Sequence, residues 1–71
     1  MSRLTTERKS YIVVWGSWDN ADNGVYDKKT DKQLLSGYQV GMIGLEMYQV
    51  SGYSDSEITR TIKRYNEWRA S

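Results

Sequence analysis

Apolar side chains near the start of the chain follow a pattern that predicts a β-hairpin. Residues 11–15 are β-branched and aromatic, and the run is too short for a helix, so it predicts a buried strand. Residues 16–24 are rich in turn formers and end in Asn-Gly, and a second strand is predicted to begin at Val25. We therefore expect a hairpin over residues 10–28. The polar and charged residues 1–9 are expected to be frayed.

The middle of the chain, residues 30–50, is compatible with two arrangements. Thr30 and Gln33 are spaced as in a capping box, and the leucines and tyrosine that follow would form one apolar helix face. Glycine recurs at positions 37, 41 and 44, and each glycine costs about 1 kcal/mol relative to Ala inside a helix. We therefore favour a short helix over about 31–38, a loop, and a strand over about 45–50. The alternative is one glycine-containing helix over 31–50.

The last segment, residues 54–69, predicts an amphipathic helix. Ser54 and Glu57 are spaced as the two members of a capping box. Tyr53 and Ile58 occupy the two positions of a hydrophobic staple. Apolar residues then continue at helical spacing, and most of the charged residues fall on the opposite side.

Together these elements predict a small single domain of the α+β class over residues 1–71. The N-terminal hairpin is expected to pack against the long C-terminal helix, with a short helix or strand between them. Four large aromatic residues are expected in the core, namely Trp15, Tyr38, Tyr65 and Trp68.

Composition argues against catalysis and against a metal site. The chain has no Cys and no His, so the usual activated nucleophiles, general bases and thiolate or imidazole ligands are missing. The acidic loop 19–24 does not match an EF-hand, because Ala21 stands at the third position, which requires an oxygen ligand, and Thr30 stands at the twelfth, which requires Glu. We therefore predict a protein that is not an enzyme and that uses no metal or cofactor.

Charge and hydropathy bound the partners and the compartment. Ten basic and nine acidic residues give a net charge of +1, which is less basic than a dedicated nucleic-acid module. No apolar run approaches the length of about 18 residues that a membrane span requires, and the N-terminus lacks the apolar segment of a signal peptide. A cytoplasmic protein without membrane contact is the expectation.

The aromatic content favours binding to a protein. Trp, Tyr and Arg are enriched at the energetic centres of protein interfaces, and a chain of this size is not expected to bury all nine aromatic rings. We predict a small interaction protein that binds and modulates a protein partner, as the small regulators and inhibitors made by phages do. The predicted contact residues are Trp18, Tyr26, Arg60 and Arg64.

The basic residues support an alternative function, nucleic-acid binding. A set of five cations would contact phosphates, with aromatic rings available for stacking. The competing interpretation is a solvated helix face with a Lys63–Glu67 pair. Self-association through an aromatic patch is compatible with either function. The predicted phosphate-contacting residues are Lys28, Lys29, Arg60, Lys63 and Arg64.

Three short motifs resemble a known family. The segments YIVVW at 11–15, NGVY at 23–26 and QLLSGY at 33–38 are similar to the hybrid-binding domain of ribonuclease H, a module shared with viroplasmin proteins. The resemblance covers about the first 40 residues and implies a ββαβα arrangement that grips RNA–DNA hybrids or double-stranded RNA. In a separate resemblance, residues 45–58 are similar to the first two helices of a helix-turn-helix.

Overall fold

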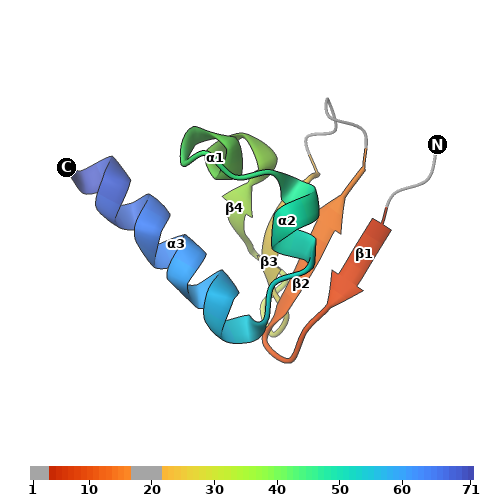
Figure 1. The fold of residues 1–71 in the computed structure, drawn as a ribbon. Coiled ribbons are helices and arrows are strands. Elements are labelled where there is room, and N and C mark those ends of the chain that lie inside the picture. The colour runs from red at the N-terminus through yellow and green to blue at the C-terminus, as the bar shows by residue number, and fades with distance from the viewer. Residues whose placement is uncertain (1–3, 17–21) are drawn as a thin grey trace.

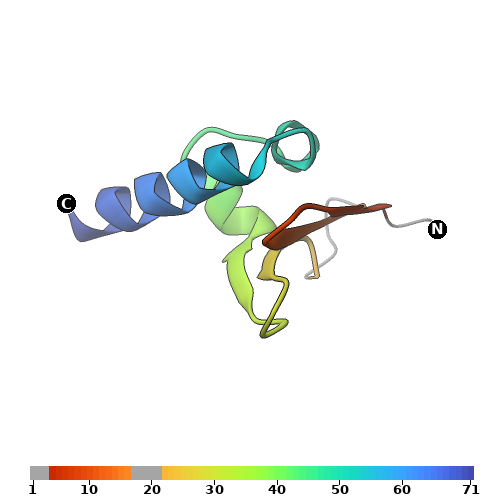
Figure 2. The same ribbon diagram turned by 90° about the horizontal axis from the view of Figure 1, so that it is seen from below.

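The computed structural model describes residues 4–16 and 22–71, in which a four-stranded sheet is followed by three helices (Figure 1). The strands are joined in sequence order into an antiparallel meander, β1-β2-β3-β4. All three helices lie on one side of the sheet (Figure 2). The prediction of a small α+β domain with a long C-terminal helix is confirmed. The elements are β1 Leu4–Glu7, β2 Tyr11–Trp15, β3 Gly24–Asp27, β4 Gln33–Ser36, α1 Gly37–Met42, α2 Met47–Ser51 and α3 Asp55–Ala70.

The predicted hairpin is present as β2 and β3, and it forms the centre of the sheet. Val13 of β2 lies opposite Val25 of β3, which in turn lies opposite Leu35 of β4. All three side chains are almost completely buried and point to the side covered by the helices. Because side chains alternate between the two faces of a strand, these three aliphatic residues form one row across the sheet, on the face that packs against the helices.

Residues 4–7 form strand β1, so the prediction that residues 1–9 are frayed is wrong for this part of the chain. β1 pairs with β2 in a register that sets Thr6 opposite Val13. Thr5 and Thr6 are β-branched, which suits a strand. They are also polar, as residues of an edge strand can be, so the segment shows no hydrophobic alternation. The sequence pattern therefore misses it.

The predicted helix over 31–38 is also wrong, because this segment contains strand β4. Asp31 adopts a left-handed φ of 61°, which is incompatible with a helix passing through it. The Asp27 carboxylate accepts hydrogen bonds from the backbone N–H groups of Lys29 and Thr30, at 2.8 and 3.1 Å. The polar residues of the expected cap therefore build the β3–β4 turn, and pairing with β3 outweighs local helix preference.

Helix α1 begins later than predicted, at Gly37. Its cap is Ser36, whose hydroxyl accepts from the Gln39 N–H at 3.1 Å, while Gln39 Oε1 accepts from the Ser36 N–H at 2.9 Å. Gly44, with a φ of 80°, follows the end of this helix. The single helix over 31–50 is therefore wrong as well.

The strand predicted over 45–50 is helix α2. Its N-cap is Glu46, whose backbone N–H donates to Gln49 Oε1 at 3.1 Å, and Val50 is its buried residue. Four strands therefore precede three helices, which differs from the ββαβα order. Residues 52–54 separate α2 from α3, and the likeness of residues 45–58 to a helix-turn-helix stays a prediction.

Helix α3 confirms the prediction for residues 54–69 to within one residue at each end. Ser54 Oγ accepts from the Glu57 N–H at 3.3 Å, and Glu57 Oε1 accepts from the Ser54 N–H at 2.9 Å. Ile58 is fully buried and Tyr53 packs against the same core, as a hydrophobic staple requires.

Two side chains tie the helices to the sheet and to each other. Arg8, in the β1–β2 turn, donates from Nε to the Tyr53 carbonyl at 2.6 Å and from Nη2 to the Ser51 carbonyl at 2.8 Å. Arg64 of α3 donates to the carbonyl of Ile43, the residue that caps α1, at 2.8 Å. The buried apolar core that these contacts enclose consists of Val13, Val25, Leu35, Val40, Ile43, Val50, Ile58 and Tyr65.

Candidate interaction surfaces

The residues predicted to contact a protein partner do not form one surface. Trp18 lies outside the described residues. Tyr26 lies on the face of the sheet opposite the helices, in a shallow hollow that it shares with Ile12 and Val14. Its hydroxyl donates to the Asp22 carbonyl at 2.7 Å. Arg60 and Arg64 belong to α3, which is on the other side of the sheet.

The two arginines of α3 differ in what they contact. Arg60 is exposed and lies near Glu57. Hydrogen bonds from Ser54 and, less strongly, the charge of Arg60 hold the pKa of the Glu57 carboxyl below its ordinary value. Arg64 is bonded to the Ile43 carbonyl and therefore supports the fold. Both line a hollow of about 420 Å³ beside α3, together with apolar atoms of Leu45 and Tyr53.

The residues predicted to bind nucleic acid are also divided between two places. Lys28 and Lys29 line a recess of about 330 Å³ with Lys9, where the β1–β2 and β3–β4 turns meet. Lys28 Nζ donates to the Arg8 carbonyl at 3.2 Å and lies 4.0 Å from a carboxylate oxygen of Glu7. The cations of α3 line other hollows. We call the Lys9, Lys28 and Lys29 site the lysine recess.

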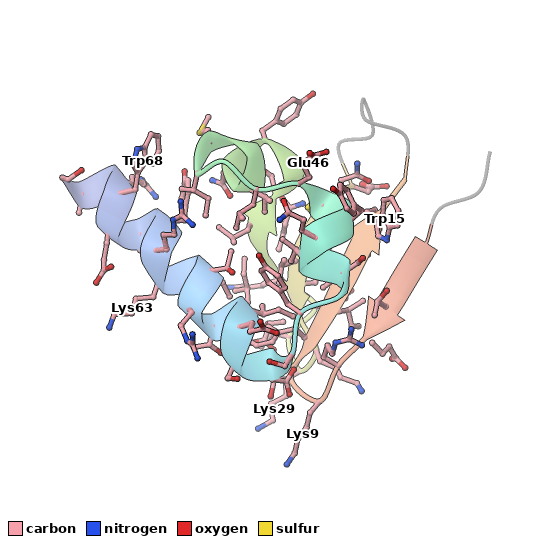
Figure 3. All side chains as sticks on the ribbon, in the orientation of Figure 1. Lys9, Trp15, Lys29, Glu46, Lys63 and Trp68 are labelled. Carbon is pink, nitrogen blue, oxygen red and sulfur yellow. The ribbon has the colours of Figure 1, made fainter. Side chains whose placement is uncertain are left out.

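The expected Lys63–Glu67 pair is not formed in the structure. Both residues are exposed on α3, and within residues 4–16 and 22–71 no ion pair joins them. Lys63 lines the hollows on two sides of α3, and Figure 3 shows its side chain pointing away from the body of the domain. Its ammonium group is therefore free to contact a ligand.

Large apolar side chains are exposed on the helical layer, and this surface was not predicted. Tyr38 and Trp68, which we expected in the core, are 66% and 50% exposed; Tyr65 is buried as expected and Trp15 is half-buried. Met42 and Tyr48 are 56% and 57% exposed. We call the set Tyr38, Met42, Tyr48 and Trp68 the apolar ridge.

The members of the apolar ridge lie on three helices, and α1 is linked to each of the other two. Tyr38 and Met42 are four residues apart on α1, so they share one face of that helix, while Val40 faces the core. α1 contacts α2, which carries Tyr48, and the Arg64–Ile43 bond ties α3 to the end of α1. The spacing of Tyr38 and Met42 was visible in the sequence, but it acquires meaning only once α1 is known to be a helix.

Trp68 is held in place by its neighbour in the core. Its ring centroid lies 5.9 Å from that of Tyr65, with the planes tilted by 38°. Because Tyr65 is buried, one side of the indole ring is supported while half of the side chain stays open to solvent. A supported, exposed indole ring loses little conformational entropy on binding, which suits an anchor residue.

Comparisons with known proteins do not assign this chain to a family. No family model matches it, and searches of curated proteins and of solved structures give no match. The similarity to the ribonuclease H hybrid-binding domain therefore stays a prediction from short motifs. Among the described residues, no helix has the length and apolar character needed to cross a membrane.

Proposed function

We propose that this protein is a small non-catalytic interaction module that binds and modulates a protein partner through the apolar ridge. The observation that carries the proposal is the exposure of four large side chains, each at least half open to solvent, on adjoining helices. Exposed apolar side chains that gather on neighbouring helices mark a candidate interaction site.

The chemistry of the ridge supports a protein as the ligand. Tyr and Trp contribute large buried areas at protein interfaces, and Met adapts its shape to the surface it meets. Helix α3, which carries Trp68, also carries exposed charged residues that could make polar contacts with the same partner. Arg60 is available for a rim contact, whereas Arg64 acts mainly by supporting the fold.

The test is the capture of proteins from an extract of the producing cells by chemical crosslinking. A variant with Tyr38→Ser and Trp68→Ser removes two anchors, and Leu34→Ser is the matched control because Leu34 is an exposed apolar residue of β4 outside the ridge. We expect the ridge variant to recover at least about tenfold less of a specific protein than the wild type and the control do. Equal recovery by all three folded proteins would contradict the proposal.

The lysine recess supports a second candidate function, the binding of double-stranded RNA or an RNA–DNA hybrid. Three lysines from two neighbouring turns line the recess together with one acidic residue, Asp27, in a chain whose net charge is only +1. Lys28 is engaged by Glu7 and the Arg8 carbonyl, so Lys9 and Lys29 are the cations most open to a ligand. Figure 3 shows Lys9 and Lys29 pointing outward at the same end of the domain. Lysines act as point charges, which suits contact with a phosphate backbone without reading its sequence.

This second function predicts affinity that depends strongly on salt. Three phosphate contacts correspond to a loss of about two to three log units in affinity per tenfold rise in salt concentration. Lys9→Ala together with Lys29→Ala should weaken binding and reduce that slope. Lys32→Ala, an exposed lysine outside the recess, is the control. Binding that is insensitive to salt and to both variants would exclude the recess as the site.

A further inference from the structure

We propose that the uncovered face of the sheet holds a docking site for an arginine side chain carried by a partner protein. The site is a hollow of about 150 Å³ on the side of the sheet opposite the three helices (Figure 2). It is separate from the apolar ridge, so it does not depend on the proposed function. We call it the sheet-face hollow, and the described residues that line it are Ile12, Val14, Asp22, Tyr26 and Asp31.

The sheet-face hollow combines apolar and acidic residues. Ile12 of β2 lies opposite Tyr26 of β3, and Val14 is two residues from Ile12, so all three point to this face and are half-buried. Asp22 and Asp31 are exposed, and the short Asp side chain keeps each charge close to the hollow that it lines. None of the described lining residues is basic. The hollow is therefore complementary to a cation with an apolar stem, which describes arginine and lysine.

Asp31 is the acid on which the proposal rests. Its N–H donates to the Asp27 carbonyl at 2.8 Å and its φ is 61°, so the β3–β4 turn fixes the position of this residue. Within residues 4–16 and 22–71, no hydrogen bond or ion pair engages its carboxylate. Lys29 and Lys32 lie in the same turn, but neither lines the sheet-face hollow. The Asp31 charge is therefore open to a cation from outside the chain.

Tyr26 gives the hollow a fixed aromatic surface. Its hydroxyl donates to the Asp22 carbonyl at 2.7 Å and accepts from Gln33 Nε2 at 3.2 Å, and these two contacts hold the ring in place. An aromatic face attracts a cation placed over it. A guanidinium group is planar and weakly hydrated, so it stacks on such a face and also meets a carboxylate with two parallel N–H groups. These properties favour arginine over lysine as the occupant.

The size of the hollow selects a single side chain. An apolar cavity of about 150 Å³ holds a group the size of benzene, so the sheet-face hollow has no room for a helix or a strand. One side chain contributes few contact atoms, and affinity rises with the number of atoms that make contact. The arginine therefore has to be carried by a longer chain, and we assign the partner to a protein with an exposed arginine.

The test titrates the isotope-labelled protein with a short, end-capped glycine peptide that contains one arginine, and follows the backbone amides by NMR. We expect saturable shifts in β2, β3 and the β3–β4 turn at about millimolar peptide. The same peptide with citrulline in place of arginine keeps the shape and lacks the charge. It should bind at least about tenfold more weakly, because the ion pair and the cation–π contact are both lost. A lysine peptide should bind more weakly than the arginine peptide.

Variants of the protein test the same contacts from the other side. Asp31→Asn removes the charge and keeps the turn, because Asn adopts a left-handed φ as Asp does. It should weaken binding of the arginine peptide at least about threefold, and Tyr26→Leu should have an effect of similar size. Glu67→Gln is the matched control, because it removes one exposed carboxylate from α3, on the other side of the sheet. This control should bind the peptide as the wild type does.

Each result decides the proposal and leaves the proposed function to its own test. The absence of saturable shifts, or shifts mainly outside β2, β3 and the β3–β4 turn, overturns it. Equal binding of the citrulline or lysine peptide, or equal losses in Asp31→Asn and Glu67→Gln, overturns recognition of a guanidinium group. The citrulline comparison needs no variant, so it stands even where a substitution prevents folding. The ridge variant with Tyr38→Ser and Trp68→Ser should bind the arginine peptide normally, which keeps the two sites distinguishable.

Discussion

Replacing Gly24 with Ala should remove most of the stability of this domain. Gly24 is buried at the start of β3 with a φ of 154°, a region that residues with a side chain rarely adopt. An added Cβ would lie 2.1 Å from the Leu35 carbonyl oxygen and 3.1 Å from the Ser36 Cα. A close carbon–oxygen contact is roughly 3.3 Å, so β3 and β4 must separate by about 1 Å.

The size of the effect follows from two contributions. Backbone strain costs about 1–3 kcal/mol, and overpacking costs about another 1–3 kcal/mol. A domain of this size has a free energy of unfolding of only about 3–5 kcal/mol, so Gly24→Ala should be largely unfolded or lose more than about 10 °C in Tm. Thermal and urea unfolding followed by circular dichroism measure the loss.

Gly41→Ala is the matched control for this substitution. Gly41 lies inside α1, and nothing lies within 4 Å of the position that its Cβ would occupy. Because Ala favours a helix more than Gly does, this variant should be stabilised by about 0.5–1 kcal/mol. If Gly24→Ala instead melts within about 5 °C of the wild type, the claim that β3 and β4 leave no room for a side chain at position 24 is refuted.

Three further predictions concern side chains that hold the helices in place. Arg8→Ala should lower the free energy of unfolding by about 2 kcal/mol in urea titrations, because two partly buried carbonyls lose a charged donor; an unchanged midpoint would refute the tie between the β1–β2 turn and α2. Arg64→Ala should lower the free energy of unfolding by about 1–2 kcal/mol, whereas Arg60→Ala should change it by no more than about 0.5 kcal/mol. Equal losses for the two variants would show that the hydrogen bond from Arg64 to Ile43 does not stabilise the fold. The pKa of the Glu57 carboxyl is lowered in the folded state, so its ionised form stabilises α3 fully above about pH 4.3 and this contribution disappears as the pH falls through the folded pKa. Glu57→Gln keeps the capping geometry without the titration, so the difference in Tm between wild type and variant should be constant from pH 7 to 5 and change below pH 4; a constant difference throughout would exclude this linkage.

The parts of the fold that could be predicted are those decided by local sequence. The strand at 11–15 is a continuous β-branched run, and Ser54 with Glu57 marks a helix start that the structure confirms. Residues 31–50 could not be predicted in the same way. Leu35 is a strand residue because it pairs opposite Val25, and that pairing connects parts of the chain ten residues apart. Propensity within a short window carries no information about such a partner.

The candidate surfaces were less predictable than the fold. The expectation that aromatic residues exceed the needs of the core was sound, but which rings are exposed depends on helix positions that the sequence did not reveal. Tyr38 lies outside the core because α1 begins at Gly37 and turns Val40 inward instead. Tyr26 and the arginines of α3 are separated because alternate residues of one strand point to opposite faces of the sheet.

Hydroxyl-radical footprinting of the apolar ridge tests the central claim most directly. The chain would be labelled first at low concentration in buffer. It would be labelled again in an extract of the cells that produce it, at the concentration it has in those cells. We predict that labelling of Met42 and Trp68 falls several-fold in the second condition while labelling of Leu34, outside the ridge, does not change. Equal labelling of the ridge in both conditions would show that no protein covers it, whether a second copy or another chain, and would contradict the account.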